Sequence, residues 1–312
     1  VNGESESVLT GVTTSGGSGT NAGSYLLTAS GSDGNYALTF VEGVLTIDKA
    51  ALTVTANDAA KTYNGLAWSG GNGVTYSGFV NGENQSVLDG SLAYGGDAQG
   101  ATNAGSYALD IGGLNAGNYA ISYQGGNLTI NKAAATITAN SANVTYNGQQ
   151  QNVSGFTASG LVNGETESVL TGVTTSGGSG TNAGSYLLTA SGSDGNYALT
   201  FVDGVLTIDK AALTVTANDA AKTYDGLAWS GGNGVSYSGF VNGENQSVLD
   251  GALVYSGDAQ GATNAGSYAL DIGGLNAGNY AISYQGGNLT INKAAATITA
   301  NSANVTYNGQ QQ

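Results

Sequence analysis

The chain repeats itself: residues 1–151 return almost unchanged as residues 162–312, a shift of 161 positions. Only small substitutions separate the two copies: Ser5/Thr166, Glu42/Asp203, Asn64/Asp225, Thr75/Ser236, Ser91/Ala252, Ala93/Val254 and Gly95/Ser256. Self-similarity at a fixed period is the signature of an array. Because an enzyme needs one assembled site, whereas an array supplies length and many copies, the repeat favours a structural or multivalent protein.

The long period contains two related units of about 80 residues, a shorter type A and a longer type B. Both share the segments Thr-Tyr-(Asn/Asp)-Gly, Val-Asn-Gly-Glu, Thr-Asn-Ala-Gly-Ser-Tyr, Gly-Asn-Tyr-Ala and Leu-Thr-Ile-(Asp/Asn)-Lys. The sequence therefore predicts five segments: partial type A (1–49), type B (50–132), type A (133–210), type B (211–293) and partial type A (294–312).

The composition excludes several classes of protein. The chain has no Cys, His, Pro or Met, so it lacks an imidazole base, a thiol nucleophile and the usual soft metal ligands. We therefore assign no catalytic residues. A net charge of −15 argues against nucleic acid and anionic membranes, which attract basic surfaces. The apolar runs are too short for a helix of roughly 20 residues to cross a bilayer.

Short alternating segments predict an all-β fold. Residues 51–57 (ALTVTAN) alternate apolar residues with Thr, the period-2 pattern of a half-buried strand. About seven such strands are expected in each unit, with one helical turn at Glu83–Leu88 and a tight hairpin at Gln124–Asn127. We expect a tandem array of small antiparallel β domains, each an immunoglobulin-like sandwich or, alternatively, a β-grasp-like sheet.

The joints between units contain no linker. Lys132 passes directly into the strand that starts at Ala133, with no run of Gly, Ser or Pro between them, so we expect a stiff head-to-tail array. The tail 294–312 repeats residues 133–151, the head 1–49 repeats residues 162–210, and only the counterpart of residues 152–161 is missing. We expect tail and head to complete one another, through a continuous backbone or through strand donation between chains.

Several of these motifs resemble known repeats. Lys222–Gly226 (Lys-Thr-Tyr-Asp-Gly) resembles the signature of the YDG repeats of large bacterial surface proteins. Type A, with Thr145–Gly148, Gly160–Glu165 and the ending Leu206–Ile208, is similar to the companion MBG repeats. The resemblance covers essentially the whole chain. It implies a secreted, extracellular adhesin of the bacterial cell surface, similar to filamentous haemagglutinins.

Two groups of residues are candidates for binding. Calcium is the one cofactor for which the sequence offers ligands, because oxygen donors in turns suit a hard cation. The candidates are Asp48, Asp58, Asp97, Asp110 and Asp209, although their spacing matches no known calcium loop, and ordinary solvated turns are the alternative. Trp68 and Trp229, one in each type B unit, lie among turn residues and could stack on a sugar.

The rare lysines have two interpretations. Lys49, Lys132, Lys210 and Lys293 each end a unit beside Asp or Asn. Such a lysine discourages edge pairing or, as in some adhesins, forms an isopeptide bond with Asn or Asp.

Two functions remain from the sequence. The first is a stiff extracellular stalk or filament, whose partners are the neighbouring repeats. The second is a multivalent module that binds a host or matrix glycan or protein through Trp68, Trp229 and exposed Tyr.

Overall fold

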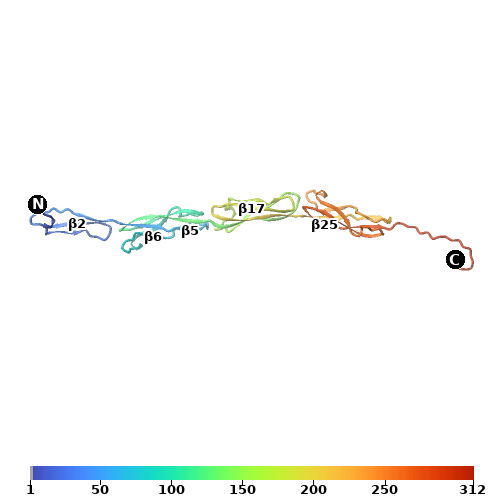
Figure 1. The fold of residues 1–312 in the computed structure, drawn as a ribbon, viewed down its shortest axis with the longest axis horizontal. Helices are drawn as coiled ribbons and strands as arrows, with labels where there is room; N and C mark the ends of the chain where they lie inside the picture. The colour runs from blue at the N-terminus through green and yellow to red at the C-terminus, as the bar shows by residue number, and fades with distance from the viewer. Residues whose placement is uncertain (1–2) are drawn as a thin grey trace. The chain divides into compact units, whose positions relative to one another are not determined.

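The computed structural model describes residues 3–312 (Figure 1). Regular structure in these residues consists of β-strands and four single-turn 3-10 helices, with no α-helix. The all-β class predicted from the alternating segments is therefore confirmed.

Each type B repeat contains seven strands in two sheets. In residues 211–293 these elements are β20 (Ala211–Ala217), β21 (Ala220–Thr223), β22 (Val235–Ser238), η4 (Gln246–Val248), β23 (Asp250–Ser256), β24 (Gly266–Asn276), β25 (Tyr280–Gln285) and β26 (Gly287–Asn292). Four strands form one sheet in the order β21-β26-β24-β23, and three form the other in the order β22-β20-β25. Buried residues of both sheets form one hydrophobic cluster.

Residues 50–132 repeat this arrangement with β4 (Ala50–Ala56), β5 (Ala59–Thr62), β6 (Val74–Ser77), η2 (Gln85–Val87), β7 (Asp89–Gly95), β8 (Gly105–Asn115), β9 (Tyr119–Gln124) and β10 (Gly126–Asn131). The sheets have the orders β5-β10-β8-β7 and β6-β4-β9. The predicted helical turn at Glu83–Leu88 is present as the 3-10 turn η2.

The alternation in β20 explains how these strands build a core. Leu213 and Val215 are fully buried between the less buried Thr214 and Thr216. Successive side chains of a strand point to opposite faces, so the apolar set faces the other sheet. The Thr face bonds across to β25, where the Oγ1 atom of Thr216 donates to the Oε1 atom of Gln285 at 3.2 Å.

Two strand pairs in each type B repeat are parallel. β20 pairs with β25 from Ala211↔Tyr280 to Thr216↔Gln285, and β21 pairs with β26 from Ala220↔Leu289 onward. Immunoglobulin domains are built from antiparallel sheets, so this repeat keeps two packed sheets but adds parallel pairs to them. A β-grasp would need an α-helix over one sheet, and the described residues contain only single-turn 3-10 helices.

The predicted hairpin at Gln124–Asn127 is wrong. β9 and β10 follow one another closely, but β9 pairs with β4 whereas β10 pairs with β5 and β8. The two glycines carry the chain from one sheet to the other, and the Oδ1 atom of Asp58 accepts a bond from the Asn127 amide at 2.8 Å. The alternating pattern looks the same on both sides of such a turn, so it does not reveal the change of sheet.

The type A repeat at 133–210 has a comparable set of elements. They are β11 (Ala133–Ala139), β12 (Ala142–Thr145), β13 (Gln151–Asn152), β14 (Phe156–Ser159), η3 (Glu167–Val169), β15 (Val173–Gly177), β16 (Ser179–Gly180), β17 (Gly184–Gly192), β18 (Tyr197–Val202) and β19 (Gly204–Asp209). Its sheets have the orders β12-β19-β17-β15, β14-β11-β18 and β13-β16.

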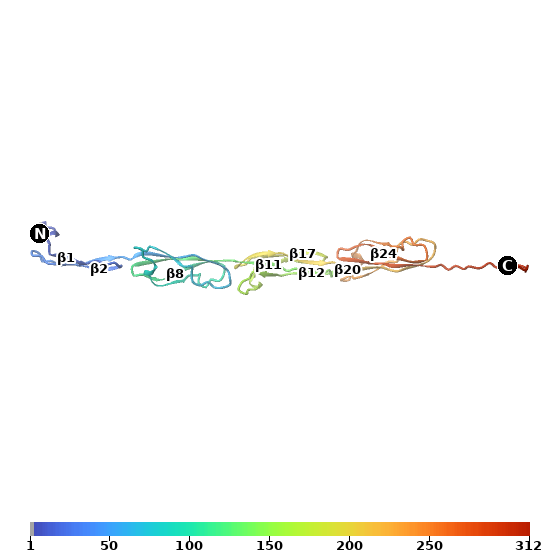
Figure 2. The ribbon, with the colours of Figure 1, turned by 90° about the horizontal axis from the view of Figure 1, so that it is seen from below.

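The two end segments are less complete. The head contains η1 (Glu6–Val8), β1 (Val12–Gly16), β2 (Gly23–Gly31) and β3 (Gly43–Ile47), in one sheet of order β1-β2-β3. Residues 294–312, all within the described part of the chain, contain no strand and follow β26 as a coil (Figure 2). The head and the tail therefore lack the second sheet that an intact repeat has.

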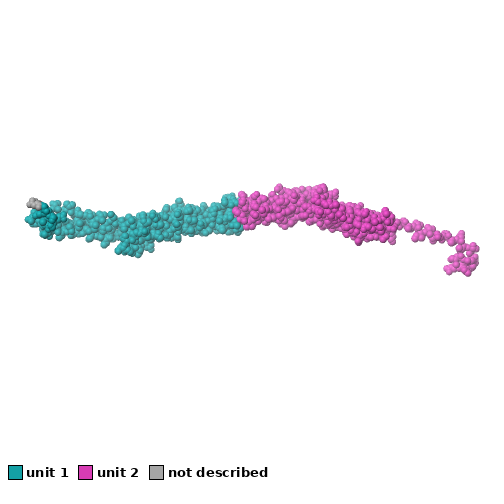
Figure 3. Space-filling view, viewed as in Figure 1, with its two compact units in different colours: residues 1–136, 158–173, 192–200 teal, residues 137–157, 174–191, 201–312 magenta. Residues whose placement is uncertain are grey.

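The described chain divides into two compact units (Figure 3). One comprises residues 1–136, 158–173 and 192–200, and the other comprises residues 137–157, 174–191 and 201–312. The division falls inside the type A repeat, so each unit contains one whole type B repeat and one complete joint to the neighbouring type A sequence.

Most apolar residues at alternating positions of the central strands are buried. Leu128, Ile130, Leu109 and Val54 of type B are at most 2% exposed, as are their type A counterparts Leu206, Ile208, Leu188 and Ile137. Ile121, Tyr107, Leu199 and Tyr186 are only half-buried.

The head offers an internal control for the energy of this core. Leu206 is fully buried, whereas Leu45, its counterpart in the head, is 39% exposed. We expect Leu206→Ala to lower the free energy of unfolding by about 2–5 kcal/mol, and Leu45→Ala by less than about 1 kcal/mol. Chemical denaturation of the full chain measures both values, and equal losses would contradict the difference in burial.

Candidate functional site: the joint between consecutive repeats

The first complete joint is held by one carboxylate between two tyrosines. Tyr63 of the type B repeat donates its hydroxyl proton to the Oε1 atom of Glu165 in the following type A repeat, at 2.5 Å. Tyr197 of that type A repeat donates to the other carboxylate oxygen, also at 2.5 Å. The rings of Tyr63 and Tyr197 meet edge to face with centroids 5.4 Å apart. Hydrogen bonds to an ionised acceptor are among the strongest in proteins.

The second joint repeats this geometry with the types exchanged. Tyr146 of the type A repeat donates to Glu244 of the following type B repeat at 2.6 Å, and Tyr280 donates to the same carboxylate at 2.5 Å. The two rings are again edge to face, at 5.6 Å. A repeat of either type can therefore stand before or after the joint and supply the same contacts.

A tight turn presents the glutamate. Asn163 and Gly164 both have positive φ, 53° and 73°, the conformation of a type I′ turn, which Asn and Gly adopt most readily. The side-chain amide of Asn163 donates to the carbonyl of Gly65 across the joint, at 3.4 Å. A Cβ atom on Gly65 would lie 2.8 Å from the Cβ atom of Asn163. The glycine of the Tyr-(Asn/Asp)-Gly segment is thus required where the two repeats touch.

An asparagine reaches back from each repeat to the one before it. Asn196 accepts a bond from the amide of Ala104 at 2.8 Å and donates to the Oδ1 atom of Asn103 at 3.2 Å. Asn279 makes the same pair of bonds to Ala183 and Asn182, at 2.9 and 3.1 Å.

The terminal lysines also bond across the joints. The Nζ atoms of Lys49, Lys132 and Lys210 donate to main-chain carbonyls of Ala116, Asp194 and Ala277 in the next repeat, at 2.6–2.9 Å. Their partners are carbonyl oxygens, so the structure gives these lysines a bonding role in the joint that the sequence interpretation did not include.

The carboxylates alter the acidity of the tyrosines. The hydrogen bond to Glu165, together with burial, raises the pKa of Tyr63 from 10.0 to about 12. The bond to Glu244 raises the pKa of Tyr146 to about 12 for the same reason. A phenolate beside a carboxylate is repelled by it, so each joint stabilises the neutral phenol.

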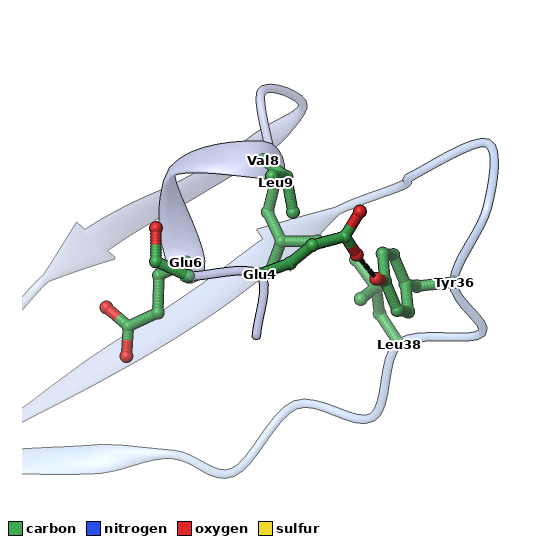
Figure 4. Close-up of a pocket in the computed structure, with 7 residues that line it drawn as sticks. Glu4, Glu6, Val8, Leu9, Tyr36 and Leu38 are labelled. Atoms are coloured by element: carbon green, nitrogen blue, oxygen red, sulfur yellow. Dashed lines mark hydrogen bonds between the residues drawn. The ribbon is translucent and has the colours of Figure 1, made fainter. Parts of the chain in front are cut away.

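The head presents one half of such a joint (Figure 4). Tyr36 donates its hydroxyl proton to Glu4, as the counterparts Tyr197 and Glu165 do in the intact repeat. Both line a pocket of about 220 Å³ together with Val8, Leu9 and Leu38.

The calcium candidates are dispersed. Asp48, Asp97, Asp110 and Asp209 are exposed, and Asp58 caps the amide of Asn127. Among residues 3–312, no group of three or more His, Cys, Asp or Glu side chains is placed to hold a metal ion. No helix of the described chain is long and apolar enough to cross a membrane.

The tryptophans are bound into their loops. The indole N–H of Trp68 donates to the carbonyl of Gly70 at 3.0 Å, and its main-chain groups bond Ala101 and Gly100. Trp229 makes the equivalent bonds and packs against the hydrophobic core of its repeat. Both rings are half-buried. Binding of a sugar by these rings stays a prediction.

Sequence reasoning missed the tyrosines and glutamates of the joint as a site. The signal was the shared frame itself, because Thr-Tyr-(Asn/Asp)-Gly and Val-Asn-Gly-Glu recur in both types. Each of these segments on its own reads as an ordinary turn, and their contact lies between residues 63 and 165, far apart in the chain.

One protein-family model matches the repeats that contain these segments. The MBG domain (YGX type) matches four times, at residues 1–46, 52–129, 135–207 and 213–290. The chain belongs to the MBG domain family. Both type A and type B segments match the same family, and the resemblance to it noted in the sequence is confirmed. MBG domains occur in bacterial surface proteins.

Other comparisons of the MBG chain are weaker. No curated protein matches it. Among solved structures, it is similar to Drosophila N-cadherin EC1-3, with 10% identity over 77% of this chain and 98% of that one, and a TM-score of 0.24. It is also similar to the TIE protein of Bacillus anthracis, with 6% identity over 88% of this chain and 61% of that one, and a TM-score of 0.21. A third similar structure is SGBP-B of the Bacteroides ovatus mixed-linkage glucan utilization locus, in complex with a mixed-linkage heptasaccharide. It has 14% identity over 75% of this chain and 65% of that one, with a TM-score of 0.15.

Removing one hydroxyl tests the joint between MBG repeats. Tyr63 is 6% exposed, whereas Tyr224, the same position of the second type B repeat, is 44% exposed. We expect Tyr63→Phe to cost roughly 1.5–3 kcal/mol, the range for a hydrogen bond to a charged group, and Tyr224→Phe less than about 0.5 kcal/mol. The measurement is native-state hydrogen exchange of the Ala104 amide, which donates to the Oδ1 atom of Asn196 across the joint. Equal effects of both variants would contradict a role for the hydroxyl.

The raised pKa predicts a loss of stability in alkali. Because Tyr63 ionises at about 12 in the folded chain and at 10.0 in the reference state, its contribution is complete below pH 10 and is lost as the pH rises through 12. We expect a titration of the Tyr63 ring by carbon NMR to show the high value in the native chain and a lower value in Glu165→Gln. An ionisation of Tyr63 at or below 10 in the native chain would refute the effect of the carboxylate.

Proposed function

We propose that this chain is a structural segment of a secreted bacterial surface adhesin, in which MBG repeats are joined into a stiff stalk that holds an adhesive part away from the cell. The observation that carries the proposal is the bonded joint. A carboxylate, an asparagine and a lysine each bond across it, at the place where a flexible linker would otherwise stand.

The bonds across a joint limit how far one repeat can rotate relative to the next. A rotation at the joint has to separate Tyr63 from Glu165, and Asn196 from Asn103, at the same time. Water replaces these partners only in part, since Tyr63 is buried there. Several bonds across the joint therefore oppose bending, whereas a Gly- and Ser-rich linker opposes none.

The small size of each repeat supports the same function. A unit of about 80 residues buries roughly 60% of its unfolded surface and is close to the lower limit of independent stability. This chain has no cysteine to form a disulfide. Neighbouring repeats supply what the unit lacks, because the buried Tyr63 ring packs on Tyr197 of the next repeat. A stalk is the arrangement in which every internal repeat has such neighbours.

We do not propose glycan binding as a second function. The indole N–H groups of Trp68 and Trp229 are bonded to carbonyls of their own loops, and a multivalent lectin role therefore lacks a specific supporting observation.

Stiffness is measured directly by distances between spin labels placed in adjacent repeats of the full chain. We expect a narrow distance distribution across each joint in the native chain and a broader one in Glu165→Ala and Glu244→Ala. Glu83→Ala is the matched control, since Glu83 accepts a bond from Tyr119 of its own repeat. A native distribution as broad as that of a flexible linker would overturn the proposal.

A further inference from the structure

The first and the last strands of a type B repeat run side by side in the same direction. In residues 50–132, β4 pairs in parallel with β9, and β5 pairs in parallel with β10. In both pairs each residue lies opposite the one 69 positions later, from Ala50↔Tyr119 to Thr62↔Asn131. The register therefore stays the same where the two segments cross together from one sheet to the other. We call this continuous pairing the terminal ladder.

Side-chain bonds add to the main-chain pairing of the terminal ladder. At the crossing between the sheets, the Oδ1 atom of Asp58 accepts a bond from the Asn127 amide at 2.8 Å. Before the crossing, the Oγ1 atom of Thr55 donates to the Oε1 atom of Gln124 at 3.2 Å. The two segments are thus bonded in both sheets and between them.

Main-chain bonds close both ends of the ladder. The amide of Ala50 donates to the carbonyl of Asn118 at 2.9 Å, and the amide of Tyr63 donates to the carbonyl of Asn131 at 2.7 Å. The hydroxyl of the same Tyr63 bonds Glu165 in the next repeat. The end of the ladder and the joint therefore share one residue.

The other intact repeats have the same feature. In residues 211–293 the ladder runs from Ala211↔Tyr280 to Thr223↔Asn292, and Asp219 makes the bond at the crossing. In the type A repeat the last strand, β19, pairs in parallel with β12. The parallel pairing of an early strand with the last one is thus common to all three.

The direction of these strands decides how a pull on the chain loads them. The chain enters the repeat at β4 and leaves it after β10, with no linker on either side. Tension pulls β4 and β5 toward their N-terminal end and β10 toward its C-terminal end. Because the segments are parallel and their bonds are evenly spaced along the strands, the pull slides one segment past the other and loads the bonds together. Antiparallel segments would instead separate at one end, one bond after another.

We propose that the terminal ladder is a shear clamp, by which each intact repeat bears tension along the chain without unfolding. Sliding has to break the ladder in one step and to move the buried side chains Leu52, Val54, Leu128 and Ile130. Forced unfolding depends on the rate of unfolding rather than on the equilibrium stability, so a small repeat can still resist a pull. This inference goes beyond the proposed function, because stiffness concerns bending at the joints and the clamp concerns load within one repeat.

The test is single-molecule force spectroscopy of the full chain, with one repeat pulled in two directions. The chain has no cysteine, so two introduced cysteines fix the points of attachment. Ala51→Cys with Asn131→Cys loads the ladder in shear, whereas Thr62→Cys with Asn131→Cys pulls two register partners apart at one end. All three positions are exposed, and chemical denaturation should give both variants the same free energy of unfolding.

We expect the unfolding force to be severalfold higher in shear than in the second direction. The shear event should lengthen the chain by roughly 220–250 Å, the reach of about 80 extended residues less the length of the folded ladder. Equal forces in the two directions overturn the inference.

A substitution within the ladder gives a second measurement. Asp58→Ala removes the bond at the crossing and should lower the force in shear. Asn57→Ala is the matched control, because the side chain of Asn57 bonds the carbonyl of Asn72 at 3.1 Å, outside the ladder, and the force should not change. A loss with Asn57→Ala as large as with Asp58→Ala would place the load elsewhere and refute the clamp. None of these substitutions removes a bond across a joint, so the stiff stalk and the clamp can fail separately.

Discussion

Each joint depends on one carboxylate that two tyrosines of different repeats share. A carboxylate in a partly buried position is costly unless hydrogen bonds replace the water it has lost. Glu165 obtains one donor from its own repeat, Tyr197, and the other from the preceding repeat, Tyr63. The solvation of this charge and the placement of two neighbouring repeats are therefore the same interaction. In the head, Tyr36 bonds Glu4 as Tyr197 bonds Glu165.

The substitutions between the two long copies agree with this dependence. None of the seven changes a side chain that bonds across a joint. Ser91/Ala252, Ala93/Val254 and Gly95/Ser256 fall in β7 and β23, which lie at the edge of the four-stranded sheets. Asn64/Asp225 adds an ion pair with Lys222 at 2.7 Å at the surface, where such pairs contribute little. Variation is thus found where a side chain touches its own repeat or solvent.

The contrast between the intact type A repeat and residues 294–312 shows how much the fold of a strand depends on the rest of its repeat. Ile137 and Ile298 have identical local sequences, yet one is core and the other is exposed. Strand propensity alone therefore does not fold this segment. The apolar face has to pack against the rest of a repeat, and the free energy of that burial favours the folded strand.

The sequence by itself determined the array, its period, the all-β class and most of the core, because these follow from repetition and from the alternation of apolar residues with Thr. It also contained every motif of the joint, but as separate turns. Only the tertiary structure decided that β9 and β10 belong to different sheets, and that Tyr63 and Glu165 meet although 102 positions separate them. The physical reason is that alternation specifies which face of a strand is buried, not which strand lies beside it. Hydrogen bonds between distant turns exist only once both repeats are folded.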